Sequence, residues 1–306
     1  MSKITLYKTD NNNKAEQIKE KPFKLEKEIQ RVFENNLQLI MGLQIVKSEF
    51  TIKDRRIDTL AYDPQSKAFV IIEYKLNKNH SVVDQGMTYL SLMLQNKADF
   101  VLEYYEVFKK NLPKNEIDWS QSRVVFVSTD FTEFQIEAAN FKDLAIELWE
   151  IKRYDNNTLA ITSINKSKAA QSIKPFFDKN KGYKDVTNEI KVYTEEDHLQ
   201  GKSDEIVELY ERFKLSILNL TDDIEIKPSK LYISFKKNGS NIVDIEIKKT
   251  YLKLYINMKK GELDDPKKIM RDISNVGHWG NGDYQTKIFD TKDIEYIMSL
   301  VKQAIK

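Results

Sequence analysis

RIDTLAYDPQSKAFVIIEYK, residues 56–75, contains two β-prone runs separated by a polar segment. The intervening Asp63-Pro64-Gln65-Ser66-Lys67 is typical of a turn, so the stretch predicts a β-hairpin. Its second run, Phe69 to Ile72, is apolar at every position. Such a strand has two apolar faces and is expected inside a sheet that is covered on both sides.

The register of this hairpin predicts where its charged residues meet. If Pro64–Lys67 form a four-residue turn, Asp63 pairs with Ala68, and the same register sets Asp58 opposite Glu73. Directly opposed residues share one face, with Cβ atoms about 5 Å apart. Lys75 lies two residues beyond Glu73 and points to the same side.

Two carboxylates at this separation repel each other, and a divalent cation removes the conflict. Mg²⁺ takes one or two carboxylates and keeps its other positions for water and phosphate oxygens. We therefore expect Asp58 and Glu73 to bind Mg²⁺ or Mn²⁺ and Lys75 to assist an attacking water. The alternative is that Lys75 only bridges two surface carboxylates, because Glu-x-Lys recurs elsewhere in this chain.

Composition narrows the class of protein. The 306 residues include 49 Lys and Arg against 47 Asp and Glu, a net charge of +2, and 41% are hydrophobic. This profile is typical of a soluble globular protein, and a nucleic-acid surface would have to come from local clustering of charge. The absence of cysteine excludes thiolate chemistry. No apolar run approaches the roughly 20 residues of a membrane span, so we expect a cytoplasmic protein that is not a transporter.

Apolar periodicity around the hairpin predicts an α/β fold with a mixed sheet flanked by helices. The expected helices are residues 23–40, 82–94, 100–109 and 133–140. The expected strands are residues 44–52, 57–62, 68–76, 123–128, 145–154 and 158–164.

Two domains are expected, residues 1–165 and 195–306, joined by a linker at 166–194 whose periodicity dissolves into Lys, Ser, Asp and Asn. The second domain is expected to be a smaller α+β unit. Its predicted helices are residues 195–218, a short one after Pro266, and residues 292–305. Its predicted strands are residues 224–227, 231–237, 242–247, 252–258 and 284–289.

Arg56-Ile57-Asp58, the apolar run and Glu73-Tyr74-Lys75 together resemble the PD-(D/E)xK nuclease superfamily. The helix before the hairpin and Gln85-Gly86-Met87-Thr88-Tyr89 after it are similar to flanking motifs of its RecB-like and NucS-like branch. The resemblance covers roughly residues 20 to 165. It implies a restriction-endonuclease-like fold in which Asp58 and Glu73 hold the metal and Lys75 assists the water.

The same resemblance suggests roles for further residues. An acid on the preceding helix completes the metal shell, and Glu28 is chosen here over Glu26 and Glu49. Gln85 joins the catalytic group, while Tyr89 and Arg56 position the nucleic acid. Each could instead be an ordinary structural residue. Arg55 stands where NucS-like sequences usually have glycine.

The segment from about residue 210 to the end resembles an uncharacterised bacterial C-terminal domain that commonly follows NucS-like modules. Some proteins of this architecture carry the label "predicted transport protein", which the lack of an apolar span does not support. Aromatic residues and lysines alternate in this segment, which fits either a base-stacking surface or core packing. They are Tyr232, Phe235, Tyr251, Tyr255 and Trp279 with Lys230, Lys236, Lys237, Lys253 and Lys259.

These expectations combine into a metal-dependent DNA endonuclease acting in DNA repair or phage defence. The expected partner is single-stranded, branched or modified DNA, RNA is an open alternative, and a homodimer is compatible with the sequence. The competing hypothesis is a catalytically inactive nuclease fold that binds nucleic acid or regulates another protein. Intact Asp58, Glu73 and Lys75 favour the enzyme.

Overall fold

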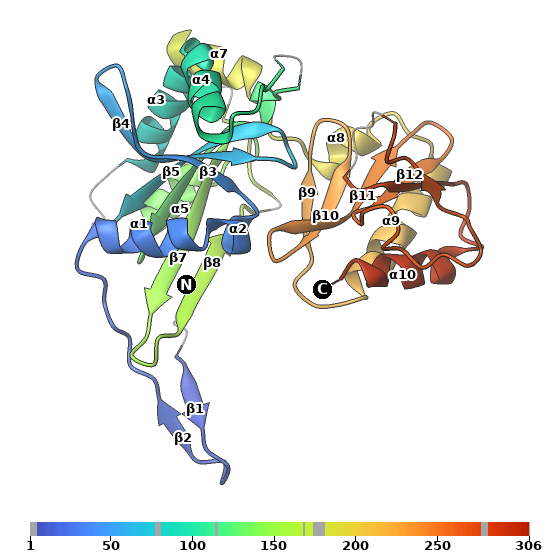
Figure 1. Ribbon diagram of the computed structural model, residues 1–306, viewed down its shortest axis with the longest axis horizontal. Coiled ribbons are helices and arrows are strands. Elements are labelled where there is room, and N and C mark those ends of the chain that lie inside the picture. Colours follow the sequence, from blue (N-terminus) through green and yellow to red (C-terminus); the bar gives the residue numbers. More distant parts are fainter. Residues whose placement is uncertain are drawn as a thin grey trace. The chain divides into compact units, whose positions relative to one another are not determined.

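The computed structural model describes residues 5–76, 81–113, 116–167, 169–173, 181–276 and 281–305. The chain divides into two compact units (Figure 1). The first comprises residues 1–37 and 43–191, and the second comprises residues 38–42 and 192–306. Each unit is described by itself.

A six-stranded mixed sheet forms the centre of the first unit, with strand order β3-β4-β5-β6-β7-β8. Its strands are β3 (Gln44–Ile52), β4 (Arg55–Asp63), β5 (Ala68–Lys75), β6 (Arg123–Ser128), β7 (Ile146–Arg153) and β8 (Leu159–Ile164). The pairs β5/β6 and β6/β7 are parallel, and the others are antiparallel. The chain from β5 to β6 therefore crosses over the sheet through α3 (Val82–Gln95) and α4 (Lys97–Phe108).

Helices cover both faces of this sheet, which confirms the predicted fold class (Figure 1). Phe33 of α1 (Glu26–Asn35) contacts Tyr74 on one face, and Phe100 of α4 contacts Phe69 on the other. Phe69 and Tyr74 are separated by an odd number of positions on β5, so they point to opposite sides. Residues Ala68 to Glu73 are accordingly buried throughout.

The predicted hairpin register is confirmed from Asp63 to Thr59, where Asp63 pairs with Ala68 and Thr59 with Ile72. Asp63 also stabilises the turn, because its Oδ1 accepts hydrogen bonds from the backbone N–H groups of Gln65 (3.0 Å) and Ser66 (3.2 Å). An acceptor side chain at the first position is a common way to fix such a turn.

Several elements differ from their predicted extents. The helix expected at 23–40 is interrupted at Asn36 and continues as α2 (Leu37–Met41), and that expected at 195–218 is divided into α8 (Glu195–Leu199) and α9 (Asp204–Leu218). Gly201, with a φ of +71°, separates the second pair. Within the expected linker, α7 (Lys181–Glu189) forms and packs on α3. The apolar residues of this helix, such as the buried Val186, are too isolated in the sequence to produce a clear helical periodicity.

Other short elements complete the first unit. They are a small hairpin of β1 (Tyr7–Thr9) and β2 (Ala15–Gln17), the 3₁₀ helix Trp119–Gln121, and α5 (Glu133–Ala139). No helix among the described residues is both long enough and apolar enough to cross a bilayer.

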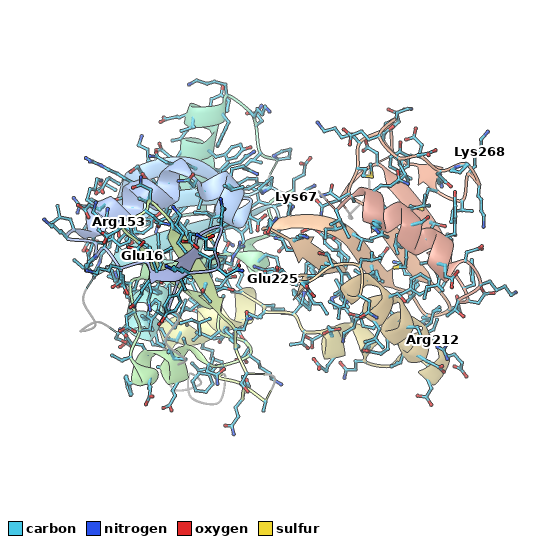
Figure 2. The ribbon with its side chains drawn as sticks, turned by 90° about the horizontal axis from the view of Figure 1, so that it is seen from below. Glu16, Lys67, Arg153, Arg212, Glu225 and Lys268 are labelled. Carbon is cyan, nitrogen blue, oxygen red and sulfur yellow. The ribbon has the colours of Figure 1, made fainter. Side chains whose placement is uncertain are left out.

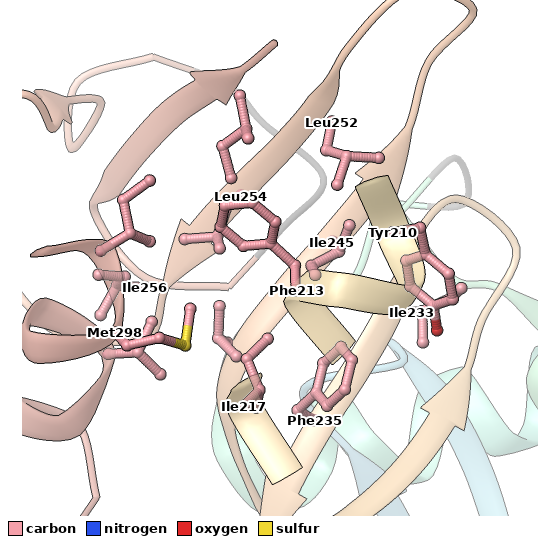
Figure 3. Close-up of a cluster of buried hydrophobic side chains, with 14 of the residues drawn as sticks. Tyr210, Phe213, Ile217, Ile233, Phe235, Ile245, Leu252, Leu254, Ile256 and Met298 are labelled. Carbon is pink, nitrogen blue, oxygen red and sulfur yellow. The ribbon is translucent and has the colours of Figure 1, made fainter. Parts of the chain in front are cut away.

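An antiparallel six-stranded sheet with order β13-β14-β12-β11-β10-β9 forms the second unit. Its strands are β9 (Glu225–Pro228), β10 (Ile233–Lys237), β11 (Ser240–Ile247), β12 (Leu252–Ile256), β13 (Arg271–Asp272) and β14 (Tyr284–Ile288). One face packs on α9 and α10 (Ile294–Gln303), and Figure 3 shows Phe213 and Ile217 of α9 and Met298 of α10 in this core. The short helix expected after Pro266 does not form, since residues 266–267 adopt a turn and residues 268–270 are irregular.

Helix α3 lies unusually close to its sheet at Gly86. A Cβ built there would stand 2.4 Å from Cδ1 and 2.9 Å from Cγ1 of Ile146 on β7. Both distances are below van der Waals contact, so a side chain at residue 86 requires Ile146 or the helix to shift.

We therefore expect Gly86→Val to lower the free energy of unfolding by about 2 kcal/mol or more, through overpacking. Thermal or urea denaturation measures the change. Adding Ile146→Ala removes the clashing atoms, so the double variant should be destabilised by less than the sum of the two single variants. Strict additivity would show that the two sites do not contact each other.

Candidate functional site

The candidate site lies at the carboxyl end of β5, where two helices begin. Backbone N–H of Leu76, one residue after β5, donates to Oε1 of Glu26 in the first turn of α1 at 2.9 Å. Ser81 caps α3, since its Oγ accepts from the N–H of Asp84. Helix N-termini carry unpaired N–H groups and a partial positive charge, so this edge of the sheet favours anions.

Asp58 and Glu73 interact closely at this edge. The paired register of β4 and β5 ends at Thr59 and Ile72, and beyond it the side chains of Asp58 and Glu73 bond to the backbone in place of the ladder. Glu73 Oε1 accepts from the backbone N–H of Asp58 at 3.1 Å, and Asp58 Oδ2 accepts from that of Tyr74 at 3.0 Å. These reciprocal bonds fix both carboxylates on neighbouring strands.

Burial makes the charged form of this carboxylate pair energetically unfavourable. Glu73 is only 2% exposed. Burial, followed by the negative charge of Asp58, raises the pKa of Glu73 to about 7, while Lys75 opposes the rise. Burial likewise raises the pKa of Asp58, and the charges of Glu49 and Glu26 add to this against the effects of Tyr74 N–H and Lys75. The pair is therefore a place where additional positive charge would be stabilising.

Three donors converge on Glu73. Besides the N–H of Asp58, its Oε2 accepts from Lys75 Nζ and from Gln85 Nε2, each at 3.2 Å. Gln85 also donates to the hydroxyl of Tyr89 at 3.3 Å, one turn further along α3. The structure thus brings Asp58, Glu73, Lys75 and Gln85 together, and their catalytic and metal-binding roles stay a prediction.

Tyr89 and Arg56 meet through a backbone atom. The Tyr89 hydroxyl donates to the carbonyl oxygen of Arg56 at 3.3 Å, and its ring is buried. Burial and then the charge of Glu73 raise the pKa of Tyr89 to about 12. The Arg56 side chain is 67% exposed and pairs with Glu49 at 2.9 Å. In this arrangement Tyr89 ties α3 to β4, and only Arg56 offers a surface to a ligand.

Glu28 has its polar contacts outside this cluster. Its Oε2 accepts from the backbone N–H of Lys24 at 3.1 Å and from Arg153 on β7 at 3.3 Å, and these contacts lower its pKa. Figure 2 labels Arg153 in the first unit. Glu26 has instead the contact with Leu76 and an influence on Asp58. Of the two acids, Glu26 therefore lies nearer the carboxylate pair.

Glu49, the third acid considered, stands on β3 beside Asp58 but has other partners. Its φ of +55° is uncommon for a non-glycine residue. The carboxylate accepts from Lys27 Nζ at 2.6 Å and pairs with Arg56. It therefore neutralises two cations next to the site.

A buried amide on α1, absent from the sequence-based set, supports Asp58. Gln30 Nε2 donates to the carbonyl oxygen of Asp58 at 2.9 Å and to Oε1 of Glu34 at 3.0 Å. Glu34 in turn accepts from Thr59 Oγ1 at 2.5 Å. The signal in the sequence was a polar residue beside Ile29, inside the apolar stripe of the helix.

The donor set fits a hard divalent cation that is held by few protein ligands. Among the described residues, no three acidic or histidine side chains gather closely enough to form a metal site by themselves. Asp58 and Glu73 supply carboxylate oxygens, and their unfavourable burial as a pair would be relieved by a cation. Two carboxylates with water and phosphate completing the shell are characteristic of Mg²⁺ sites.

A protein of Haemophilus influenzae described as "Uncharacterized protein" is 56% identical to this chain over 298 residues, which is 97% of this chain and 98% of that protein. The two chains belong to one family. Residues 195–306 also match the family described as "Domain of unknown function (DUF5655)". This match begins at the first residue of α8 and covers the whole antiparallel sheet.

Two solved structures show a weak similarity to this chain. One is titled "Structure of EndoMS-dsDNA2 complex", with a TM-score of 0.27, 15% identity, 42% of this chain and 47% of that chain. The other is a repair endonuclease from Pyrococcus abyssi, with a TM-score of 0.22, 18% identity, and 40% and 45% of the two chains. The chain thus spans less than half the length of either solved chain.

Proposed function

We propose that this protein is a metal-dependent deoxyribonuclease that hydrolyses internal phosphodiester bonds. The observation that carries the proposal is the buried and mutually repelling pair Asp58 and Glu73, with Lys75 bound to one of them at the edge where α1 and α3 begin. Stability alone does not favour burying two interacting carboxylates, and functional sites are where such perturbed groups gather.

In this proposal Asp58 and Glu73 hold Mg²⁺ or Mn²⁺. A bound divalent cation supplies a water of lowered pKa and neutralises negative charge on the phosphate. The reciprocal backbone bonds of the two carboxylates keep them in place before any ligand arrives. Gln85 fixes the second oxygen of Glu73, so this carboxylate does not have to reorganise when substrate binds.

Lys75 would act on the water and the phosphate. Its ammonium lies 3.2 Å from Glu73, with a side chain that is 17% exposed, so it is available to a ligand at the strand end. As an ammonium it has three donors and no acceptor, so it can orient the attacking water or stabilise charge developing on the phosphoryl oxygens. Arg56, which is largely exposed, would hold the nucleic-acid backbone.

Glu26 and Glu28 form a matched pair for testing the third acid. We expect Glu26→Gln to lower the metal-dependent cleavage rate about 10- to 100-fold, because the residue lies beside the metal ligands and orients groups around them. Glu28→Gln should leave the rate nearly unchanged, since Glu28 is held by Arg153. Initial cleavage rates of the two variants measure the difference. The reverse order would restore Glu28 as the third acid.

A panel of labelled nucleic acids tests the proposed activity and the competing hypothesis together. Single-stranded, branched, modified and duplex DNA, with matching RNA, are incubated with the protein in Mg²⁺, Mn²⁺ or EDTA. The proposal requires DNA cleavage in metal and none in EDTA. Salt-sensitive binding without cleavage in either metal would establish the inactive binding protein instead. Cleavage restricted to RNA would change the substrate.

A further inference from the structure

The sheet face of the second unit that does not pack on α9 and α10 carries alternating aromatic and basic residues. Leu252, Leu254 and Ile256 of β12 lie in the core shown in Figure 3. Successive side chains of a strand alternate between faces, so Tyr251, Lys253 and Tyr255 point to the other side.

The neighbouring strand continues this pattern. Lys253 pairs with Lys287 and Tyr255 with Gln285 on β14, and the register extended by one residue sets Tyr251 opposite Phe289. We call Tyr251, Lys253, Lys287 and Phe289 the aromatic–lysine patch. In this patch two aromatic rings oppose each other across the strands, and two ammonium groups oppose each other at the next pair of positions on the same face.

The aromatic side chains of the second unit differ in how far they are exposed to solvent. Phe235 is fully buried in the core and Tyr255 is 2% exposed, so core packing was the better interpretation for both. Trp279 lies outside the described residues. Tyr251 is partly exposed, and Phe289 is 65% exposed, so two rings remain accessible in the patch.

The two accessible rings lie side by side. Their centroids are 5.4 Å apart with an interplanar angle of 40°, and Lys287 Nζ lies 5.1 Å from the centroid of Tyr251. Aromatic rings beside cations on a sheet are the means by which proteins stack unpaired bases while holding the phosphates.

The charges of the patch are not balanced internally. Lys253 and Lys287 oppose each other directly on neighbouring strands, an arrangement that lowers stability. Lys253 pairs with Glu246 at 3.4 Å, a carboxylate that also pairs with Lys248. Among the described residues Lys287 has no carboxylate at ion-pair distance, and Lys249 at the adjoining turn is exposed. A polyanion would relieve this excess of positive charge.

We propose that the aromatic–lysine patch binds single-stranded nucleic acid, with bases stacked on Tyr251 and Phe289 and phosphates held by Lys253 and Lys287. Duplex offers phosphates but no exposed base faces, so the rings give selectivity for single strands. This site is independent of the nuclease proposal, because its residues belong to the second unit and its binding needs no metal.

Fluorescence anisotropy of the full-length protein with labelled 20-nucleotide poly(dT) and poly(U), and with a 20-base-pair DNA duplex, tests the patch. All titrations contain EDTA, so cleavage does not contribute. Phe289→Ser and Lys287→Ser should each weaken single-strand binding about fivefold or more. Lys287→Ser should also lower the slope of log K against log salt by about 0.7.

Matched controls separate the patch from general effects. Leu215→Ser on α9 replaces an apolar side chain that is 56% exposed, and Lys302→Ser on α10 removes an exposed lysine on the helical side. Both should bind as wild type does, and Phe289→Tyr should retain binding. Thermal melts verify that each variant is folded.

The outcomes decide the proposal. Loss of affinity for either poly(dT) or poly(U) in the patch variants, with duplex binding unchanged, supports it and shows which of the two strands the patch accepts. Affinities equal to those of the controls for both single strands, or an equal loss for duplex, overturn it. Cleavage by the first unit is not measured, so failure here leaves the nuclease proposal standing.

Discussion

Asp58→Asn is expected to lower the cleavage rate about 10³-fold or more, because it removes a proposed metal ligand. The same change should raise the free energy of unfolding of the metal-free protein by about 1 kcal/mol, since it removes the repulsion with buried Glu73. Asn retains an oxygen that can accept from Tyr74 N–H. Activity and stability should therefore change in opposite directions.

Initial cleavage rates and urea denaturation in EDTA measure the two effects of Asp58→Asn, and calorimetric titration with Mn²⁺ measures the loss of metal binding. Asp54→Asn is the control, because its carboxylate is 84% exposed on the neighbouring turn and changes by the same atoms. Unaltered Mn²⁺ affinity together with lower stability would show that Asp58 is a structural residue.

Lys75→Ala is expected to lower the cleavage rate about 10²- to 10³-fold while leaving Mn²⁺ binding in place, because Lys75 is not a proposed ligand. Its effect on stability should be opposite to that of Asp58→Asn. Removing the ammonium leaves Glu73 buried with less compensation, at a cost of roughly 1–3 kcal/mol.

The contrast between the two variants is the informative result. Rates, Mn²⁺ affinity and unfolding free energy are measured on Lys75→Ala, with Lys110→Ala as the control at an exposed position. A Lys75→Ala protein that cleaves at the wild-type rate would remove Lys75 from the catalytic group, and stability unaffected by the change would show that it does not compensate Glu73.

The hairpin could be predicted from sequence because local chemistry determines it. Asp63 and the turn after it fix the register, and the period of two then places Asp58 opposite Glu73 without knowledge of the rest of the fold. The position of Gln85 near the end of β5 could be predicted for a similar reason, since its helix begins shortly after that strand. Tyr89 also lies near this site, but its ring is buried and its hydroxyl donates to a backbone carbonyl oxygen.

The side-chain contacts that could not be predicted from sequence depend on packing between distant segments. Glu26 and Glu28 share the first turn of α1, and which of them approaches β5 depends on Arg153, more than a hundred residues away. The buried amide of Gln30 likewise acquires its role only when β4 passes beneath the helix. Neither pairing leaves a local pattern.

In the second unit, too, local features could be predicted from sequence and long-range contacts could not. Alternation along β12 could be predicted, but the pairing of Lys253 with Lys287 requires the strand order β11-β12-β14, which places a distant strand beside it. The aromatic–lysine patch is therefore a product of topology, and Phe289, its most exposed ring, does not stand out in the sequence.

The most direct test of the proposed nuclease activity compares the cleavage rates of wild type and Lys75→Ala, purified in parallel, on the DNA that the panel identifies. Product formation by wild type is expected in Mg²⁺ and none in EDTA, with a rate at least about a hundredfold lower for Lys75→Ala. Equal rates for both proteins, or no cleavage of any DNA by wild type in Mg²⁺ or Mn²⁺, would contradict the proposal.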